Sequence, residues 1–330
     1  MNSEYFRDKR VLVAGGSGFI GTNLTASLLL KGAQVRSTYC KTNPRQRLDK
    51  VEYVQANLLL ENDCKKATED IDFVFMAAAE SSGAAVMDKT PLVHLTPNII
   101  MNAQILASAY ENKVARFCFI SSNSVYPVTD FAVKEDDAEY DFFEKYFVVG
   151  WMKRFSEIMC EMYSSKIENS LDTVTVRPGN LYGPFDKFNY RESKVIAALI
   201  RRAIEAEDPF LVWGEGYDVK DFLYIDDFIE GLLLAFEYAK DFKPINIASG
   251  KPITIREVVD VILEVTGHEP TNLKFDSSKP TMIPKRLIDI ERMSELTSWL
   301  PKTTLKDGIL KTTIWYKEMF KDKTPEEIEI

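Results

Sequence analysis

Short strand-like runs alternate with longer amphipathic stretches through the first half of the chain. The runs predict buried strands at 11–14, 34–39, 51–55, 73–77 and 117–120. Helical spacing of the apolar residues predicts helices between them, clearest over 19–31, which stops at Gly32, and over 97–112. Strands that alternate with helices in this way predict an α/β fold with a doubly wound parallel sheet.

The second half of the chain follows a less regular pattern. Helices are predicted at 142–165, 193–207, 226–238 and 255–266, and short strands at 173–176, 210–213 and 245–247. We therefore expect a Rossmann-type dinucleotide-binding domain from 1–178 plus 212–249. A smaller mixed α/β lobe from 179–211 plus 250–330 would bind the substrate.

A glycine-rich turn joins the first predicted strand to the first predicted helix. Its pattern is Gly15-x-x-Gly18-x-x-Gly21. The first glycine permits a tight turn, the second lets backbone approach a pyrophosphate, and the third lets helix and strand pack closely. An anion would rest on the unpaired amides at the start of the helix. The turn predicts a dinucleotide cofactor.

The end of the second predicted strand bears on the choice between the two pyridine nucleotides. NAD sites place a carboxylate there to bind the ribose 2′-hydroxyl. The segment 36–41 has none, whereas Lys41 and Arg45 could pair with a 2′-phosphate. We expect NADP(H). The alternative is that both cations are ordinary solvated loop residues and that the cofactor is NAD(H).

Composition excludes several other classes. The net charge is −9 and the sequence pI is about 5.1, which disfavours nucleic acid as a partner. Four cysteines without a C-x-x-C pair indicate reduced thiols, and two histidines make a histidine-rich metal site unexpected. The chain has neither an 18-residue apolar run nor a signal peptide, so we expect a cytoplasmic protein without a membrane partner.

Several further motifs support a family resemblance that extends from about residue 9 to residue 316. They are Ala77-Ala-Ala79, Asn98, Ile120-Ser-Ser-Asn-Ser-Val-Tyr-Pro127, Arg177-Pro-Gly-Asn-Leu-Tyr-Gly-Pro184 and Asp221-Phe-Leu-Tyr-Ile-Asp-Asp227. Together with the glycine turn they resemble the extended short-chain dehydrogenase/reductase family, whose members act on nucleotide sugars. The resemblance implies a homodimer formed through helices near 97–112 and 150–165. It also implies cofactor contacts from Gly15, Ser17, Gly18, Phe19, Ile20, Gly21, Asn57, Leu58, Ala77, Ala78, Ala79, Lys153, Pro178 and Asn180.

One catalytic position departs from the family pattern. The family carries Tyr-x-x-x-Lys, and Lys153 matches the lysine, but Val149 stands where the proton-transferring tyrosine belongs. Three explanations remain open. Another group transfers the proton, such as Tyr146, Ser122 or a water; the chemistry needs no tyrosine; or the chain is a catalytically impaired partner subunit. Tyr146 lies seven residues before Lys153, on the same helical face if the helix extends that far.

Within the family, three stretches (77–83, 180–188 and 276–286) most resemble members that epimerise a GDP-linked 4-keto sugar and then reduce it with NADPH. The cysteine and histidine of that epimerisation appear here as Ser124 and Asn189, neither of which is a useful acid or base near neutral pH. The Asp-Glu pair of the family's dehydratases appears as Asn123-Ser124. An amide and a hydroxyl are poor proton donors for a leaving hydroxyl, so dehydration is not expected.

The expected reaction is therefore NADPH-dependent reduction of a nucleotide-linked 4-keto sugar. An NAD-dependent C4 epimerase and a cofactor-binding partner subunit are the alternatives. The resemblance implies catalytic roles for Ser122, Tyr146 and Lys153, and substrate contacts from Ser82, Ser122, Asn123, Ser124, Asn180, Asn189, Lys194, Trp213, Lys220, Lys279 and Arg286.

Overall fold

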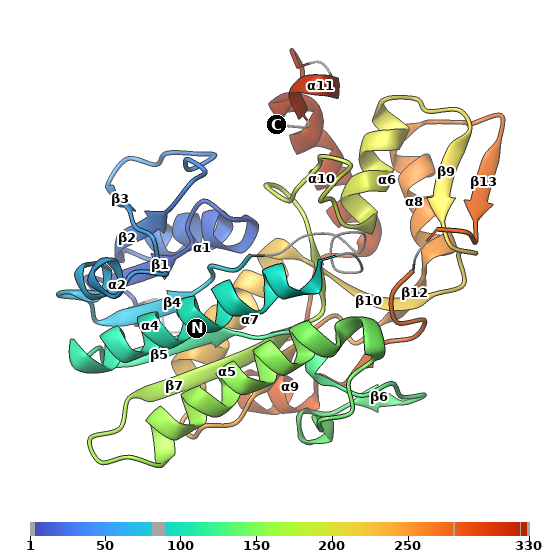
Figure 1. Ribbon diagram of the computed structural model, residues 1–330. Coiled ribbons are helices and arrows are strands. Elements are labelled where there is room, and N and C mark those ends of the chain that lie inside the picture. The colour runs from blue at the N-terminus through green and yellow to red at the C-terminus, as the bar shows by residue number, and fades with distance from the viewer. Residues whose placement is uncertain (1–3, 81–89, 280, 324, 329–330) are drawn as a thin grey trace.

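A seven-stranded, wholly parallel sheet lies at the centre of the computed structural model, which describes residues 4–80, 90–279, 281–323 and 325–328 (Figure 1). Its strands are β1 (Arg10–Ala14), β2 (Gln34–Tyr39), β3 (Val51–Gln55), β4 (Phe73–Met76), β5 (Arg116–Ile120), β7 (Asp172–Pro178) and β11 (Ile245–Ile247). The spatial order is β11-β7-β5-β4-β1-β2-β3. The predicted doubly wound sheet is confirmed, and the order reverses beside β1, where such folds bind ligands.

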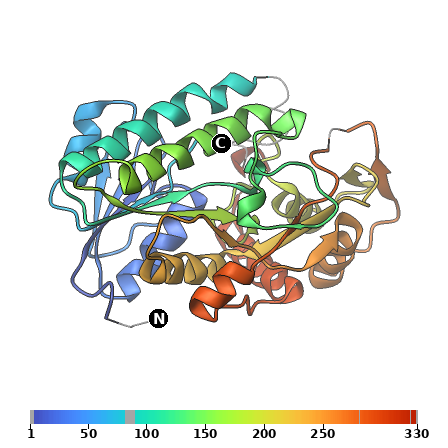
Figure 2. The ribbon, with the colours of Figure 1, turned by 90° about the horizontal axis from the view of Figure 1, so that it is seen from below.

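Helices cover both faces of this sheet (Figure 2). They are α1 (Phe19–Leu30), α7 (Ile225–Tyr238) and α9 (Glu291–Thr297) on one side, and α2 (Glu61–Thr68), α4 (Thr96–Glu111) and α5 (Phe147–Ser165) on the other. Successive residues of a strand point alternately into the two hydrophobic cores, one on each face of the sheet. Val11 and Val13 pack towards α1, whereas Leu12 and Ala14 pack towards α2 and α4. Burial on both faces explains why the central strands β1, β4 and β5 are short apolar runs, whereas β2 and the edge strand β3 contain polar residues.

Three small sheets lie outside the main sheet. They are β8 (Asn180–Tyr182), β10 (Val219–Tyr224) and β12 (Pro252–Thr254); β9 (Phe210–Trp213) with β13 (Leu273–Asp276); and β6 (Ala132–Val133) with β14 (Leu287–Ile288). The remaining helices are α6 (Val195–Ile204), α8 (Ile255–Thr266), α10 (Leu305–Met319), α11 (Pro325–Ile328) and the short 3-10 turns Pro91–His94, Asn123–Val125, Glu135–Asp137 and Glu144–Tyr146. Because β10 pairs with β8 and β12, one sheet joins segments from both predicted lobes. The division into lobes stays a prediction.

The helix predicted over 142–165 begins later than expected. Residues 144–146 form a 3-10 turn, and the α-helix starts at Phe147. Phe142 is buried against Gly150, where a Cβ atom would lie 2.7 Å from the phenyl ring. Because the chain must fold back to place this ring beside the helix, it cannot continue the helix in line. None of the described helices is long and apolar enough to cross a membrane.

A buried ion pair ties α5 to the sheet. Both oxygens of the Glu157 carboxylate accept from the Arg177 guanidinium, at 2.9 and 2.7 Å, and Oε1 also accepts from the Ser121 hydroxyl at 2.5 Å. Glu157 and Arg177 are at most 1% exposed. The pair fixes the helix that carries Lys153 against the ends of β5 and β7.

Candidate active site

The glycine turn after β1 is packed so closely that side chains would collide. Gly15 has φ +89°, and a Cβ atom there would lie 2.5 Å from Cα of Ala78. A Cβ atom on Gly21 would lie 2.1 Å from the carbonyl oxygen of Gly15, so α1 packs directly onto the turn. Glycine is therefore required at both positions for steric reasons.

The amino end of α1 is open, as an anion site requires. Gly18 occupies the N-cap with no side-chain cap, and a Cβ atom there would meet only the Gly15 carbonyl oxygen, at 3.3 Å. The first turn of the helix carries no acidic residue. The first amides and the helix dipole thus point towards a space that suits a diphosphate. Phe19 and Ile20 begin the helix, and Ser17 lies in the turn. The residues present fit the predicted dinucleotide.

The loop after β2 holds the predicted cations in different environments. Lys41 is exposed. The Arg45 guanidinium donates to the backbone oxygens of Phe185 and Asp186, at 2.6 and 2.8 Å. Arg45 therefore joins the loop after β2 to the loop that follows β8, a contact that the sequence did not predict.

The remaining predicted cofactor contacts gather at the carboxyl ends of neighbouring strands. Asn57 and Leu58 follow β3, Ala77 donates its amide to Ala14 of β1 at 2.9 Å, and Ala79 is exposed just beyond. Pro178 ends β7, and its carbonyl oxygen accepts from Asn123 Nδ2 at 3.0 Å. Parallel strands bring these segments to one edge of the sheet.

Lys153 and Ser122 lie together beyond the end of β5. The Lys153 ammonium donates to the carbonyl oxygen of Ile120 at 2.8 Å and lies 4.9 Å from the centre of the Phe119 ring. Burial lowers the pKa of Lys153 to about 8, against the opposing effect of the nearby Glu157 carboxylate. The Ser122 oxygen accepts from the Ser124 amide at 3.1 Å, which leaves its O–H to donate to a substrate oxygen.

Tyr146 precedes α5 and lines a cavity of about 350 Å³. The condition that the helix reach Tyr146 is not met, because the residue belongs to the 3-10 turn before Phe147. Burial raises the pKa of Tyr146 to about 12; the Arg286 guanidinium lowers this pKa and the Asp218 carboxylate raises it. A phenol with this pKa stays protonated at neutral pH and can donate a hydrogen bond.

Four of the predicted substrate residues line the same cavity as Tyr146. They are Asn180, Lys194, Trp213 and Lys220. Much of the apolar part of the wall comes from α6 and β9, and Trp213 is 40% exposed there. The Lys194 ammonium lies 5.7 Å from the centre of the Phe19 ring, so the cavity adjoins the amino end of α1. The glycine turn and the cavity that contains the predicted substrate residues therefore lie next to each other.

Two of the cations predicted to contact the substrate, Lys220 of the cavity wall and Arg286, already have protein partners. Lys220 Nζ contacts Asp218 Oδ2 at 3.3 Å and donates to the Ile283 carbonyl. Arg286 is 1% exposed and donates to the backbone oxygens of Tyr126 and Pro127, at 3.0 and 2.8 Å. Its Nε has no partner among the described residues, and burial lowers its pKa to about 10. Arg286 thus holds the C-terminal segment against the loop after β5.

Other predicted substrate residues are placed less directly. Asn180 donates to the Asp221 carbonyl oxygen at 2.9 Å, and Asn189 Oδ1 accepts from the Glu192 amide at 2.8 Å and so caps a turn. Lys279 is exposed and is not part of the cavity wall. Ser124 is buried, and its hydroxyl has no partner among the described residues. Ser82 lies outside the described residues.

The sequence reasoning missed Asp186, a buried carboxylate of the cavity wall. It is 4% exposed, its Oδ1 accepts from the Lys187 amide at 2.9 Å, and its Oδ2 has no partner among the described residues. Burial raises its pKa, against the nearby cations, of which Lys194 acts most strongly. Its place four residues after β8, the strand that begins with the predicted ligand residue Asn180, is the signal that could have found it.

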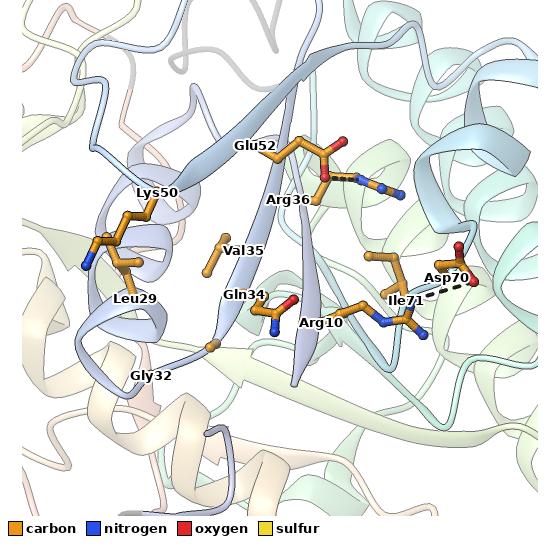
Figure 3. A pocket seen from close by; sticks show the side chains of 11 residues that line it. Arg10, Leu29, Gly32, Gln34, Val35, Arg36, Lys50, Glu52, Asp70 and Ile71 are labelled. Atoms are coloured by element: carbon orange, nitrogen blue, oxygen red, sulfur yellow. Dashed lines mark hydrogen bonds and ion pairs between the residues drawn. The ribbon is translucent and has the colours of Figure 1, made fainter. Parts of the chain in front are cut away.

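A second hollow, of about 620 Å³, lies at the opposite ends of the strands (Figure 3). Arg10, Gln34 and Glu52 line it at the amino ends of β1, β2 and β3. Arg36 pairs with Glu52 at 2.8 Å, and Arg10 lies 3.5 Å from Asp70. The glycine turn lies at the carboxyl end of β1, so this hollow is not part of the candidate active site.

Comparison with known proteins agrees with the predicted family. Residues 11–248 match the model of the NAD dependent epimerase/dehydratase family. The chain belongs to this family. Membership confirms the predicted resemblance to the extended short-chain dehydrogenase/reductase family. It also confirms the prediction that the chain is an NAD(P)-dependent enzyme.

The relatives and solved structures that the chain resembles are named as a synthase and as epimerases of nucleotide sugars. The chain is 29% identical to a GDP-L-fucose synthase from Sinorhizobium fredii, over 92% of this chain and 94% of that protein. It is 28% identical to GDP-mannose 3,5-epimerase 1 from Oryza sativa subsp. indica, over 97% and 85%. The solved UDP-glucuronic acid 4-epimerase from Bacillus cereus, in complex with UDP-glucuronic acid and NAD, superimposes with a TM-score of 0.81 at 26% identity, over 94% and 99%.

Proposed function

We propose that this protein transfers hydride at a sugar carbon of a nucleotide-linked sugar, most simply as NADPH-dependent reduction of a 4-keto sugar. The carrying observation is that one cavity contains Tyr146, Asn180, Lys194 and Lys220 and adjoins the amino end of α1 through the contact of Lys194 with Phe19. Cofactor phosphates and a substrate diphosphate would then lie on either side of one lysine. The names of the relatives support the substrate class.

The proposed roles follow from hydrogen-bonding capacity. When bound, a reduced nicotinamide supplies the hydride. Ser122 donates to the sugar carbonyl oxygen and polarises it, and Tyr146 gives this oxygen its proton as negative charge develops. The Lys153 ammonium, held on the Ile120 carbonyl oxygen, stabilises the same negative charge. Val149 has no part in the proton transfer.

The preference for NADP(H) remains part of the proposal. It is supported by the absence of a carboxylate at the end of β2 and by the presence of Lys41 and Arg45 on the following loop. A cytoplasmic location and a homodimer are proposed with it. The four cysteines are free thiols, which suits a reducing compartment.

Replacement of one hydroxyl tests the proton relay. We expect Tyr146→Phe to lower kcat for a nucleotide-linked 4-keto sugar by about 10²–10⁴-fold, the usual contribution of a positioned acid, with unchanged dinucleotide affinity. Absorbance at 340 nm measures turnover, and quenching of tryptophan fluorescence measures affinity. Tyr140→Phe is the matched control, since Tyr140 is 55% exposed and stacks on Trp151.

The proton relay is rejected if Tyr146→Phe turns over at the parent rate. If the protein binds the dinucleotide saturably but no keto sugar oxidises the bound cofactor, the partner-subunit alternative is favoured instead.

An NAD-dependent C4 epimerase is the second candidate. The observation that favours it is that Arg45 donates to two backbone oxygens of the loop after β8. This arrangement suits a cofactor that stays bound through turnover. Protein purified from cells decides between the two: an epimerase keeps NAD through purification and releases it on denaturation, whereas a reductase must release its oxidised cofactor in every catalytic cycle and is purified without a stoichiometric amount of it. Guanine is the proposed base from the names of the fucose synthase and mannose epimerase relatives, and competition between GDP and UDP tests it.

A further inference from the structure

The loop after β8 crosses from the substrate cavity to the cofactor domain. We call residues 183–188 the strap. Asn23 of α1 donates from Nδ2 to the Pro184 carbonyl oxygen at 3.1 Å, and Arg45 donates to the next two carbonyl oxygens, of Phe185 and Asp186. Three consecutive carbonyls of the strap are thus held by two separate elements of the cofactor domain.

These two elements flank the predicted dinucleotide. Asn23 lies in the first turn and a half of α1, beside the amides that suit the pyrophosphate, and Arg45 lies on the loop beyond β2, where the adenosine ribose is bound in such folds. The strap therefore spans the distance from the pyrophosphate end of the site to the adenosine end. In Figure 1 it is part of the yellow-green segment between β8 and α6.

The other side of the strap is anchored on α10. The ring of Phe185 lies 5.1 Å from that of Trp315, and the buried Phe188 ring lies 4.7 Å from that of Tyr316. Phe185 has φ +69°, the left-handed region that a bulky side chain seldom adopts. Because such a conformation persists only where the surroundings impose it, loss of the Arg45 contacts favours release of the strap.

One unpaired group in the strap also points to a ligand. Asp186 Oδ2 is buried without a partner among the described residues, and Asp186 belongs to the cavity wall. Buried carboxylate oxygens are normally hydrogen-bonded. A hydroxyl or N–H donor of a bound nucleotide would satisfy it.

We propose that the strap is a latch on the dinucleotide, so that Asn23 and Arg45 set the rate at which the cofactor leaves. The inference rests on the proposed dinucleotide site. It assigns Arg45 a role that does not depend on a 2′-phosphate, and it predicts slow release of NADH as well as NADPH. The cofactor can dissociate only after the strap carbonyls have left their donors.

Dissociation of NADH from the full-length protein measures the latch. The protein is loaded with NADH and mixed with excess NAD⁺ in a stopped-flow instrument, and the loss of nicotinamide fluorescence gives the off-rate. We expect Arg45→Ala to raise the off-rate at least about tenfold, because hydrogen bonds from a charged donor are the stronger kind. Asn23→Ala should raise it about threefold or more, and the double variant more than either.

Arg47→Ala is the matched control on the same loop. The Arg47 guanidinium lies over the rings of Tyr39 and Tyr53, at 5.8 and 5.5 Å, and has no bond to the strap in the described structure. Its off-rate should stay within about twofold of the parent rate. Hydrogen exchange of the strap amides, measured in parallel by mass spectrometry, should rise in the Arg45 and Asn23 variants alone.

The possible results separate the latch from its rivals. If the double variant exchanges its strap amides faster but releases NADH at the parent rate, the latch is refuted. If Arg45→Ala accelerates release and Asn23→Ala does not, Arg45 contacts the dinucleotide directly and the latch is also wrong. If the parent protein takes up neither NADH nor NADPH, the proposed function fails first, a result recognised by the absence of any fluorescence change.

Discussion

Lys153 is partly buried and carries a positive charge although the tyrosine that it would serve is absent. Its ammonium bonds a single carbonyl oxygen, and burial lowers its pKa to about 8. A position under selection for stability alone would replace such a group with an apolar side chain. Its presence beside Val149 argues that the ammonium acts on a ligand.

Lys153→Met is expected to remove activity and to stabilise the fold at neutral pH. A folded-state pKa below the unfolded value means that the charged form destabilises the protein, by at most about 3 kcal/mol for the lowering seen here. We expect a gain of about 1–3 kcal/mol in the free energy of unfolding, measured in urea at pH 7.

The pH dependence of this gain has a defined sign. The destabilisation is complete below pH 8 and disappears as the pH rises from about 8, the folded-state pKa, towards 10.5, where the unfolded lysine also loses its proton. The parent protein should therefore approach the stability of the variant in that range. Lys166→Met, at an exposed position of the same chain segment, should show no such convergence.

The glycines of the turn allow a test that separates folding from binding. A Cβ atom on Gly21 would collide with the Gly15 carbonyl oxygen, so Gly21→Ala should lower stability by about 1–3 kcal/mol. Gly18 has φ −80°, and a Cβ atom there would make one tight contact, 3.3 Å from the Gly15 carbonyl oxygen, so the free energy of unfolding of Gly18→Ala should stay within about 1 kcal/mol of the parent value. The substitution should nevertheless weaken NADPH binding at least about tenfold, because the methyl group enters the anion site.

Equal NADPH affinity for Gly18→Ala and the parent protein would place the phosphates elsewhere. Calorimetric titration and thermal melts on the same samples give both quantities.

At the scale of elements, α5 depends on the ion pair of Glu157 with Arg177. Removal of one partner from a buried pair leaves a charge without compensation, which commonly costs about 3–5 kcal/mol. We expect Glu157→Gln to lose about 3 kcal/mol in urea unfolding, and Glu161→Gln, one turn further along and 39% exposed, to change by less than about 0.5 kcal/mol. Comparable losses in both variants would show that the pair does not fix the helix.

The elements differed in how far the sequence could predict them. The central strands of the main sheet, β1, β4 and β5, can be predicted from local apolar runs, because burial on both faces requires apolar residues at successive positions. The predicted start of α5 was wrong. Phe142 packs against Gly150, and no helical periodicity in the sequence reveals this contact. The two-residue strands β6 and β14 pair across more than 150 residues and carry no periodicity to detect.

The site shows the same division. The glycine turn is specified by steric needs within seven residues, so it could be predicted with its purpose. The bonds of Arg45 to the strap, and the unpaired Asp186 Oδ2, arise only from the meeting of distant loops. Tyr146 was predicted to share the helical face of Lys153 if the helix reached it, but the helix begins only at Phe147. The catalytic role of Tyr146 stays a prediction.

At the scale of the whole molecule, α4 and α5 lie side by side on the outer face of the sheet (Figure 2). Phe155 and Met162 of α5 and Ile100 of α4 are 42%, 50% and 38% exposed. Phe155 and Met162 are seven residues apart and so share one face of the helix. This apolar face is the surface through which we expect two copies to associate.

Phe155→Glu tests this expectation in solution. Light scattering on a sizing column should give twice the chain mass of 37.7 kDa for the parent protein and the single chain mass for the variant, because a buried carboxylate without a partner opposes association. Leu310→Glu on α10, 44% exposed and away from this face, should leave the mass unchanged. A parent protein that elutes at 37.7 kDa across micromolar concentrations would contradict the dimer. Because the cavity and the strap lie within one chain, dissociation by Phe155→Glu should leave NADH uptake intact, so that loss of both together would show that the site depends on its partner copy.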